Sequence, residues 1–284
     1  MILSFHPCLV GDKNITCAGR QPDDEDLAAV KAADAVIMPQ GCYPSLYEMA
    51  RKYCPNVFPN YDARFQYPGK TGQIKLFRKL NAEHPKTLIF QDTTSFYNLY
   101  GTSGTNAPFN YPFVFKFDWG GEGDAVFLIQ SEGAFHEVLQ KSAEFERHNH
   151  KGFLLQEYIP SNNRSLRVVI IGKKLFSYWR VQKKGDGFYT GLGKGAEIDT
   201  HSDPDLQETA AAYVKDFSRK AGINLAGYDV LFSSEYKAGT PLLLEINYFF
   251  GRQGLGGSEA FYRLLESEVK YWLENLGLHF KHSK

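Results

Sequence analysis

The chain has 284 residues, 43% of them hydrophobic and 23% charged, which is enough to bury a sizeable core divided over one to three subdomains. Lysine and arginine, 32 together, balance 32 aspartates and glutamates, so charge gives no reason to expect nucleic acid or an anionic membrane as a general partner. No apolar run approaches the roughly 20 residues of a membrane span, and the opening MILSF lacks the basic leader and apolar stretch of a signal peptide, so we expect a cytoplasmic protein.

Residues 1–75 predict a short N-terminal α/β domain. Met1–Phe5 has the composition of a strand, and the acid-led segment DDEDLAAVKAAD predicts a helix before a strand at Ala35–Met38. Ser45 is a candidate N-cap for a second helix, with Glu48 completing a capping box. The turn-rich residues 60–72, NYDARFQYPGKTG, mark a candidate domain boundary. This unit is too short for a full dinucleotide-binding domain.

Residues 76–158 predict a second unit in which helices and strands alternate. Its expected elements, in order, are the helix QIKLFRKLN, the strand TLIF, the helix TSFYNLYG, the strand FVFKF, a glycine loop, the strand AVFLIQ, a helix over 133–147 and the strand FLLQEYI.

Residues 159–284 predict a third unit that opens with a hairpin. The segments SLRVVIIG and KLFSYWRV are joined by the turn Gly172-Lys173-Lys174. A glycine-rich stretch, FYTGLGKGA, precedes a long helix over 205–221. Two strands, AGYDVLF and PLLLEI, and a helix over 258–276 complete the chain.

The four cysteines lie at positions 8, 17, 42 and 54 and form neither a CxxC pair nor a common zinc pattern. They predict free, mostly buried thiols, as in a reducing compartment. His148 and His150 follow a helical pattern with no acidic or cysteine partner nearby, which indicates a solvated helix end rather than a metal site.

Lys116 lies in the strand FVFKF just before a glycine loop. An isolated lysine in such a strand is typical of edge protection or a solvated face. The loop Gly120, Gly121, Glu122 and Gly123, however, can turn successive N–H groups towards an anion. Lysine and loop together therefore make a candidate phosphate site.

The strand FLLQEYI ends with Gln156 and Glu157 after an apolar run. Where a strand passes into a loop, its free N–H and C=O groups can read an adenine edge, and a polar side chain can hold a ribose hydroxyl. A salt-bridged glutamate at a strand end explains the same residues equally well.

Three polar residues interrupt the two last strands. Asp229 lies among apolar neighbours, and Glu245 and Asn247, two residues apart, project from the same face of the following strand. Burying adjacent carboxylates is costly unless a cation or donors compensate. Two carboxylates and an amide oxygen suit Mg²⁺ shared with nucleotide phosphates, although a hydrogen-bonded polar cluster at the end of a sheet remains the alternative.

In this order, the strand lysine, glycine loop, QEYI segment, arginine-bearing hairpin, YD and ExN resemble the ATP-grasp superfamily, nearest the RimK-like and glutathione-synthetase-like carboxylate–amine ligases. The resemblance runs from about Thr87 to Leu276. It implies an α/β (α+β) fold in which two α+β subdomains, 76–158 and 159–284, grip ATP after the short α/β domain at 1–75.

The resemblance also implies roles for individual residues. The strand lysine contacts the phosphates, the glycine loop covers them, the hinge holds adenine, and the acidic set carries Mg²⁺, with Mn²⁺ as an alternative. A second phosphate lysine precedes the grasp domain, for which Lys70 in PGKTG is the candidate. The implied ATP residues are Lys70, Lys116, Gly120, Gly121, Glu122, Gly123, Gln156, Glu157, Tyr158 and Ile159, and the implied metal ligands are Asp229, Glu245 and Asn247.

Several positions depart from the family pattern. Ser165-Leu166-Arg167 lacks the usual ribose-holding acid, and Tyr189-Thr190-Gly191 replaces Arg-x-Asn. Ala125 stands for the third glycine of the phosphate loop, and Phe250-Gly251 for Pro-Gly. The metal and lysine elements are kept while the substrate side differs, which favours ATP chemistry on an unusual substrate.

The family mechanism activates a carboxylate as an acyl phosphate, which an amine then attacks. Arginine suits the transferring phosphoryl group and the oxyanion because its fork donates two hydrogen bonds. Arg167, Arg180 and Arg252 are the candidates, with Lys194 acting similarly from a glycine-rich lid at 185–195. Each of these is also typical of an ordinary surface charge.

Two other functions fit the same residues: a small-molecule kinase, in which a hydroxyl replaces the carboxylate, and a non-catalytic ATP-binding module. The expected partners are small-molecule or peptide carboxylates and amines, with no nucleic acid and no membrane. Dimers and tetramers are frequent among such ligases, so a homo-oligomer is an open expectation.

Overall fold

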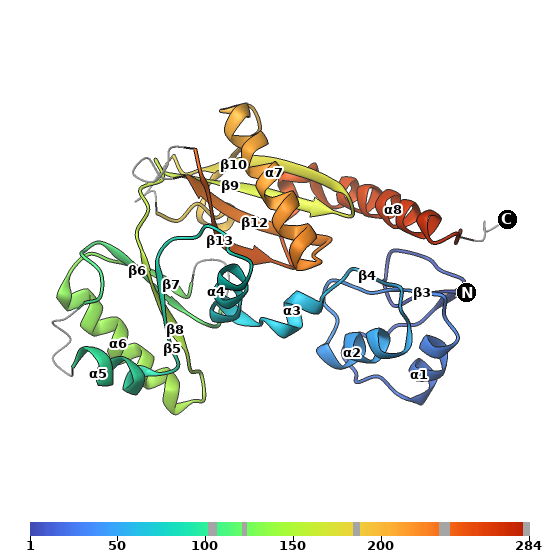
Figure 1. Cartoon of the computed structure of the whole chain (residues 1–284), viewed down its shortest axis with the longest axis horizontal. Helices are drawn as coiled ribbons and strands as arrows, with labels where there is room; N and C mark the ends of the chain where they lie inside the picture. Colours follow the sequence, from blue (N-terminus) through green and yellow to red (C-terminus); the bar gives the residue numbers. More distant parts are fainter. Residues whose placement is uncertain (102–106, 121–123, 184–187, 233–238, 281–284) are drawn as a thin grey trace.

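The structure, a computed structural model, describes residues 1–284 except 102–106, 121–123, 184–187, 233–238 and 281–284. Three sheets organise the described residues, one of them in the N-terminal part and one in each half of the remaining chain (Figure 1). No described helix is both long and apolar enough to cross a membrane.

The N-terminal sheet has four parallel strands in the order β2-β1-β3-β4. Its inner strands β1 and β3 are wholly buried and almost entirely apolar, as strands covered on both faces must be. The element bounds are β1 Ile2–Ser4, β2 Lys13–Asn14, α1 Asp24–Lys31, β3 Ala35–Ile37, α2 Pro44–Tyr53 and β4 Val57–Phe58.

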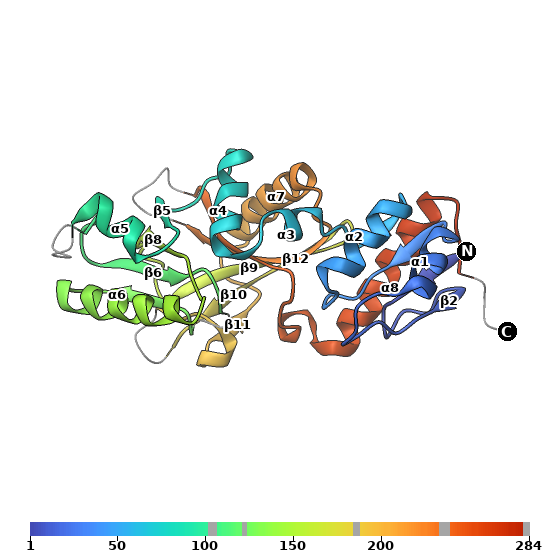
Figure 2. The ribbon, with the colours of Figure 1, turned by 90° about the horizontal axis from the view of Figure 1, so that it is seen from below.

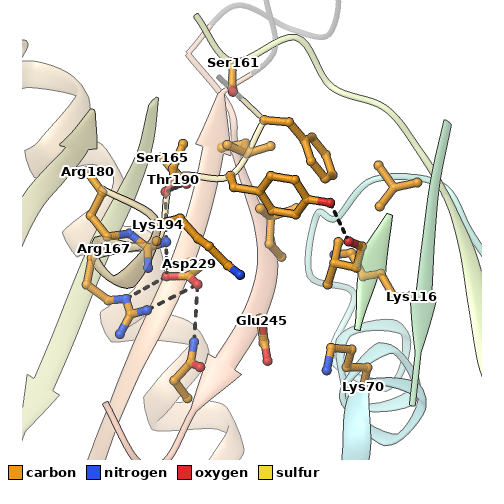
Figure 3. A pocket seen from close by; sticks show the side chains of 18 of the residues that line it. Lys70, Lys116, Ser161, Ser165, Arg167, Arg180, Thr190, Lys194, Asp229 and Glu245 are labelled. Carbon is orange, nitrogen blue, oxygen red and sulfur yellow. Dashed lines mark hydrogen bonds and ion pairs between the residues drawn. The ribbon is translucent and has the colours of Figure 1, made fainter. Parts of the chain in front are cut away.

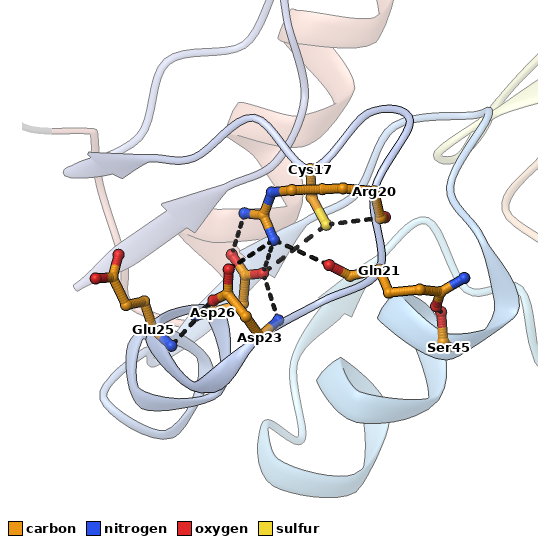
Figure 4. Close-up of polar contacts among 7 residues, drawn as sticks. All are labelled: Cys17, Arg20, Gln21, Asp23, Glu25, Asp26 and Ser45. Atoms are coloured by element: carbon orange, nitrogen blue, oxygen red, sulfur yellow. Dashed lines mark hydrogen bonds and ion pairs between the residues drawn. The ribbon is translucent and has the colours of Figure 1, made fainter.

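Helix α1 begins at a compact polar cap (Figure 4). Asp23 and Asp26 form a capping box, and the fully buried Asp26 carboxylate receives two guanidinium nitrogens of Arg20 at 2.5 and 2.9 Å. The Arg20 hydrogen bond outweighs burial and lowers the pKa of Asp26. Burial and the same carboxylate raise the pKa of Cys17, which keeps that thiol protonated.

The capping prediction for the second helix is wrong. Helix α2 begins at Pro44 after Tyr43, with no side-chain cap, because proline at the first position has no N–H to satisfy. Ser45 therefore lies inside the helix and donates to the Gln21 side chain at 2.6 Å.

Residues 60–72 are also more helical than predicted. They contain α3, Asp62–Gln66, and the start of α4, Gly69–Lys79. The Asp118 carboxylate, from another subdomain, accepts from Thr71 N at 2.7 Å. A distant side chain thus satisfies an N-terminal amide of α4, which local sequence does not reveal.

The middle sheet is antiparallel with the order β5-β8-β6-β7, and α5 and α6 cover it (Figure 1). Its core is aromatic: Phe115 stacks on Phe153 with ring centroids 4.8 Å apart, and Phe153 stacks on Phe90. The bounds are β5 Thr87–Phe90, α5 Thr93–Tyr100, β6 Phe113–Phe117, β7 Val126–Ile129, α6 Glu132–Arg147 and β8 Phe153–Glu157.

The C-terminal sheet has the order β11-β10-β9-β12-β13 and contains the predicted hairpin, β9 with β10. The short strand β11 was not expected. The bounds are β9 Arg164–Ile171, β10 Lys174–Val181, η1 Leu192–Lys194, β11 Glu197–Asp199, α7 Pro204–Ala221, β12 Leu225–Phe232, β13 Pro241–Asn247, η2 Gln253–Leu255 and α8 Gly257–Asn275.

Two apolar cores join the N-terminal sheet to the C-terminal sheet. On one side Ile37 and Val169 pack with Leu265 of α8, and on the other Val36 and Val168 share a cluster that includes α4 and α7. Figure 2 shows α8 beside the N-terminal sheet. The division at residues 75 and 158 remains a proposal; residue 75 lies within α4.

Candidate functional site

A cavity of about 430 Å³ lies between the middle and C-terminal sheets. Lysines line one wall, and a cluster of arginines and carboxylates lines the other (Figure 3).

Lys116 comes from β6, an inner strand, and is only 9% exposed, so edge protection and a solvated face are both wrong. Burial lowers its pKa to about 8, Glu245 opposes this shift, and Lys70 adds to it. Among the described residues Lys116 has no hydrogen bond or ion pair. Its ammonium therefore needs an anion from outside these residues.

Lys70 lies beside it, on the first turn of α4 rather than in a turn. Its Nζ donates to Gly120 O at 2.8 Å. The helix start is fixed by Asp118, which packs so closely that a Cβ at Gly69 would lie 2.6 Å from its carboxylate. Lys116 thus lies on β6, and Asp118 and Gly120, which hold the start of α4 and Lys70, lie directly after the same strand.

The glycine loop borders the same wall. Gly120 lines the cavity with φ +83°, and a Cβ there would lie 2.7 Å from the Cβ of Ala125. Gly121, Glu122 and Gly123 lie outside the described residues.

The predicted adenine hinge follows β8, which ends at Glu157. Gln156 donates its amide to Thr87 at 2.8 Å, so its side chain is committed to the sheet. Hydrogen bonds from this hinge to an adenine base would therefore come from backbone N–H and C=O groups. All four hinge residues line the cavity: Gln156, Glu157, Tyr158 and Ile159.

The acidic residues meet across β12 and β13, where Asp229 pairs with Glu245. Asp229 is clamped: Arg167 Nε lies 2.6 Å and Arg180 Nη2 2.8 Å from its Oδ1. Burial opposes ionisation of Asp229, but the two arginines prevail and hold its pKa below the usual value. The two strand pairings that place Arg167 and Glu245 beside Asp229 explain this cluster.

Two of the three predicted arginines, Arg167 and Arg180, thus line the cavity while bonding to Asp229. Arg180 Nη2 also donates to Ser165 Oγ at 2.9 Å, and its buried Nε has no partner in the described part of the chain. Ser165, in the family's acid position, and Thr190 share a 2.6 Å hydrogen bond and line the same cavity. In the sequence both positions are visible only as departures from the family pattern.

Lys194 closes the cavity from η1, and its Nζ bonds Asp124 at 2.7 Å. Tyr189 donates its hydroxyl to Val126 O on β7 at 2.9 Å. The segment 188–194 therefore bridges the two sheets over the cavity.

Arg252 is the described candidate that the structure leaves outside the cavity lining. Its guanidinium lies over the rings of Phe261 and Tyr262, 4.6 Å from each centroid, and Nη2 is 3.5 Å from Gln40 Oε1.

Two of the three residues proposed for Mg²⁺, Glu245 and Asn247, keep side-chain oxygens free of described partners, whereas both oxygens of Asp229 accept hydrogen bonds, Oδ2 from Arg167 Nη2 at 3.3 Å and from Asn247. Glu245 forms no hydrogen bond or ion pair with any described residue, and Asn247 uses only its Nδ2, at 3.4 Å from Asp229 Oδ2. Within the described ranges no three His, Cys, Asp or Glu side chains cluster as a complete metal site. A metal here would therefore take Asn247 and substrate oxygens as ligands besides the carboxylates.

Comparisons with known proteins identify the family of the chain and its fold. Residues 69–259 match the model of the RimK-like ATP-grasp domain. A RimK domain ATP-grasp protein from Sphaerobacter thermophilus has a similar structure at 13% identity, with a TM-score of 0.59 over 94% of this chain and 98% of that chain. The D-alanine–D-alanine ligase of Bacillus anthracis, solved with ATP, has a TM-score of 0.57 at 13% identity over 93% and 87% of the two chains.

A curated relative adds little about function. The uncharacterized MG012 homolog of Mycoplasma pneumoniae is 26% identical over 128 residues, 45% of this chain. The match spans 41% of that relative's length.

Proposed function

This chain belongs to the RimK-like ATP-grasp family, and from that premise we propose that it is an ATP- and Mg²⁺-dependent ligase that joins a carboxylate to an amine. The observation that carries the proposal is the charge arrangement of the cavity. Lys70 and Lys116, the latter with no ion pair among the described residues, face Glu245 across a space of about 430 Å³ that Asn247 also lines. Such a space suits a polyphosphate between cations on one side and a metal on the other.

In this proposal the hinge 156–159 holds adenine, and Lys70 and Lys116 hold phosphate oxygens. Glu245, Asn247 and Asp229 Oδ2 hold Mg²⁺, or Mn²⁺ in its place. When bound, the metal would act as a Lewis acid that lowers the negative charge on the transferred phosphoryl group.

The chemistry has two steps. A substrate carboxylate oxygen attacks the γ-phosphorus and ADP leaves, which forms an acyl phosphate. The amine then attacks the carbonyl carbon, the C–O bond to phosphate breaks, and the amine loses a proton to give the amide. The buried Arg180 Nε has no partner among the described residues and would donate to the negative charge that develops beside the Asp229 cluster. The segment 188–194 excludes water from the acyl phosphate.

We also propose a cytoplasmic location, which the free cysteines support. The substrates would be small molecules or peptides.

The test is release of ADP and phosphate from Mg-ATP with pools of amino acids, peptides and small carboxylates, followed by mass spectrometry of active pools. A product whose mass equals acid plus amine minus water supports ligation. A product carrying phosphate would make the protein a kinase, and ATP binding without turnover in every pool would favour a binding module.

A further inference from the structure

A second group of polar residues lies at the carboxyl ends of the N-terminal strands. In the order β2-β1-β3-β4, strand β1 lies between β2 and β3. The chain passes from β1 to β2 on one side and then crosses to β3 on the other side of β1. Ligands of open parallel sheets bind outside such a switch point. His6 follows β1 and Gln40 follows β3 at this place.

Gln40 is buried and brings two arginines together. Arg64 Nη1 donates to its backbone O at 2.5 Å, and Arg252 Nη2 lies 3.5 Å from its Oε1. Its Nε2 donates to Tyr248 O at 3.3 Å. Within the described ranges neither arginine has an acidic partner. Two positive charges thus meet at one residue without a counter-ion.

Aromatic rings hold both guanidinium groups in place. Arg64 lies 5.0 Å from the centroids of Tyr61 and Phe65, and Arg252 lies over Phe261 and Tyr262. Ring faces orient a cation without neutralising it, so hydrogen-bonding capacity remains for a ligand.

The neighbouring His6 adds no positive charge to the two arginines. Burial, and next the charge of Arg252, lower the pKa of His6 to about 4, so His6 is neutral near pH 7. The positive charge at Gln40 therefore comes from Arg64 and Arg252.

The loop that carries Arg252 begins at the wall of the cavity. Phe249, Phe250 and Gly251 line that cavity, and Arg252 is the next residue. A molecule that presents its reacting group beside Asn247 can therefore extend along this loop towards Gln40.

We propose that Arg64, Arg252 and Gln40 bind an oxyanion of the second substrate, which is therefore an acidic small molecule with a carboxylate or phosphate besides its reacting group. The claim that the oxyanion belongs to a substrate rests on the proposed function. The claim that Arg64, Arg252 and Gln40 bind an oxyanion does not depend on turnover. Arginine is suited to either oxyanion through paired N–H donors.

The first test is protection from phenylglyoxal, read residue by residue by peptide mass spectrometry on the full chain. Glutarate and glycerol 3-phosphate are the probes, the uncharged glutaramide and glycerol are the controls, and the exposed Arg147 is the reference residue. A probe at roughly twice its Kd should slow labelling of Arg64 and Arg252 about threefold by mass action. Protection by glutarate alone assigns a carboxylate, and protection by glycerol 3-phosphate alone assigns a phosphate. Equal protection by the uncharged controls, or no protection by either probe up to tens of millimolar, overturns the site.

The second test uses the substrate found by ADP release. Arg252→Gln should raise KM for that substrate roughly tenfold or more while KM for ATP stays unchanged, because a charged hydrogen bond is lost, and Arg252→Lys should recover part of the loss. A substrate without a second anionic group overturns this proposal and leaves the ligase standing. Specific protection without turnover keeps the oxyanion site and removes the ligase.

Discussion

Replacing Lys116 by methionine should stabilise the chain in the absence of nucleotide. Lys116 is buried with no ion pair among described residues, and burial lowers its pKa from 10.5 to about 8. At about 1.4 kcal/mol for each pKa unit, the buried charge costs up to about 3 kcal/mol of folding free energy near pH 7. Methionine keeps most of the side-chain volume and removes that cost.

The effect depends on pH in a defined direction. Above about pH 8 the folded chain gives up the Lys116 proton, while the unfolded chain keeps it until about pH 10.5. The unfolded state binds more protons in this window, so wild-type stability rises relative to Lys116→Met. The gain in unfolding free energy of Lys116→Met over the wild type should be complete below about pH 8 and absent above about pH 10.5.

Urea unfolding at about pH 7 and pH 10, with and without Mg-ATP, measures this. Mg-ATP should stabilise the wild type and not Lys116→Met, because the phosphates supply the missing counter-charge. Lys151→Met, at an exposed lysine, is the matched control and should change little. A methionine variant less stable than wild type at pH 7 without nucleotide would refute the reasoning.

Three other substitutions probe the opposite wall and the lysine anchor. Asp229→Asn leaves Arg167 and Arg180 without their carboxylate, and urea unfolding should show a loss of about 3–5 kcal/mol. Glu245→Gln should lower Mg-ATP turnover by roughly 100-fold with little change in unfolding free energy, since no described residue bonds to Glu245; normal ADP release would remove it from the metal set. Asp118→Ala removes the acceptor of Thr71 N and should lower the unfolding free energy by about 1 kcal/mol and raise KM for ATP. An unchanged KM would show that Asp118 does not position Lys70 for ATP.

Much of the fold followed from local pattern. The hairpin, the aromatic strands and the long helices could be placed because their hydrophobic periods and turn residues lie within a few positions of one another. The paired placement of Glu245 with Asp229 followed from the period of a strand and the pairing of sequential strands.

What the sequence did not reveal depends on distant residues. Helix α4 starts where Asp118, 47 positions away, accepts from Thr71, and residues 60–72 therefore read as a turn. The clamp on Asp229 needs the pairing of β12 with β9, and the contact between Gln40 and Arg252 joins residues 212 positions apart. No local pattern carries that information.

The shared cores around α8 and α4 determine how the molecule can open. They bind the N-terminal sheet and the C-terminal sheet into one body, while the middle sheet has its own aromatic core and touches the shared one through Leu154 and Ile89. Opening of the nucleotide cleft is thus expected to move the middle lobe alone and to leave Gln40, Arg64 and Arg252 in place. The acidic substrate and ATP should then bind in either order, since neither has to build the other's site.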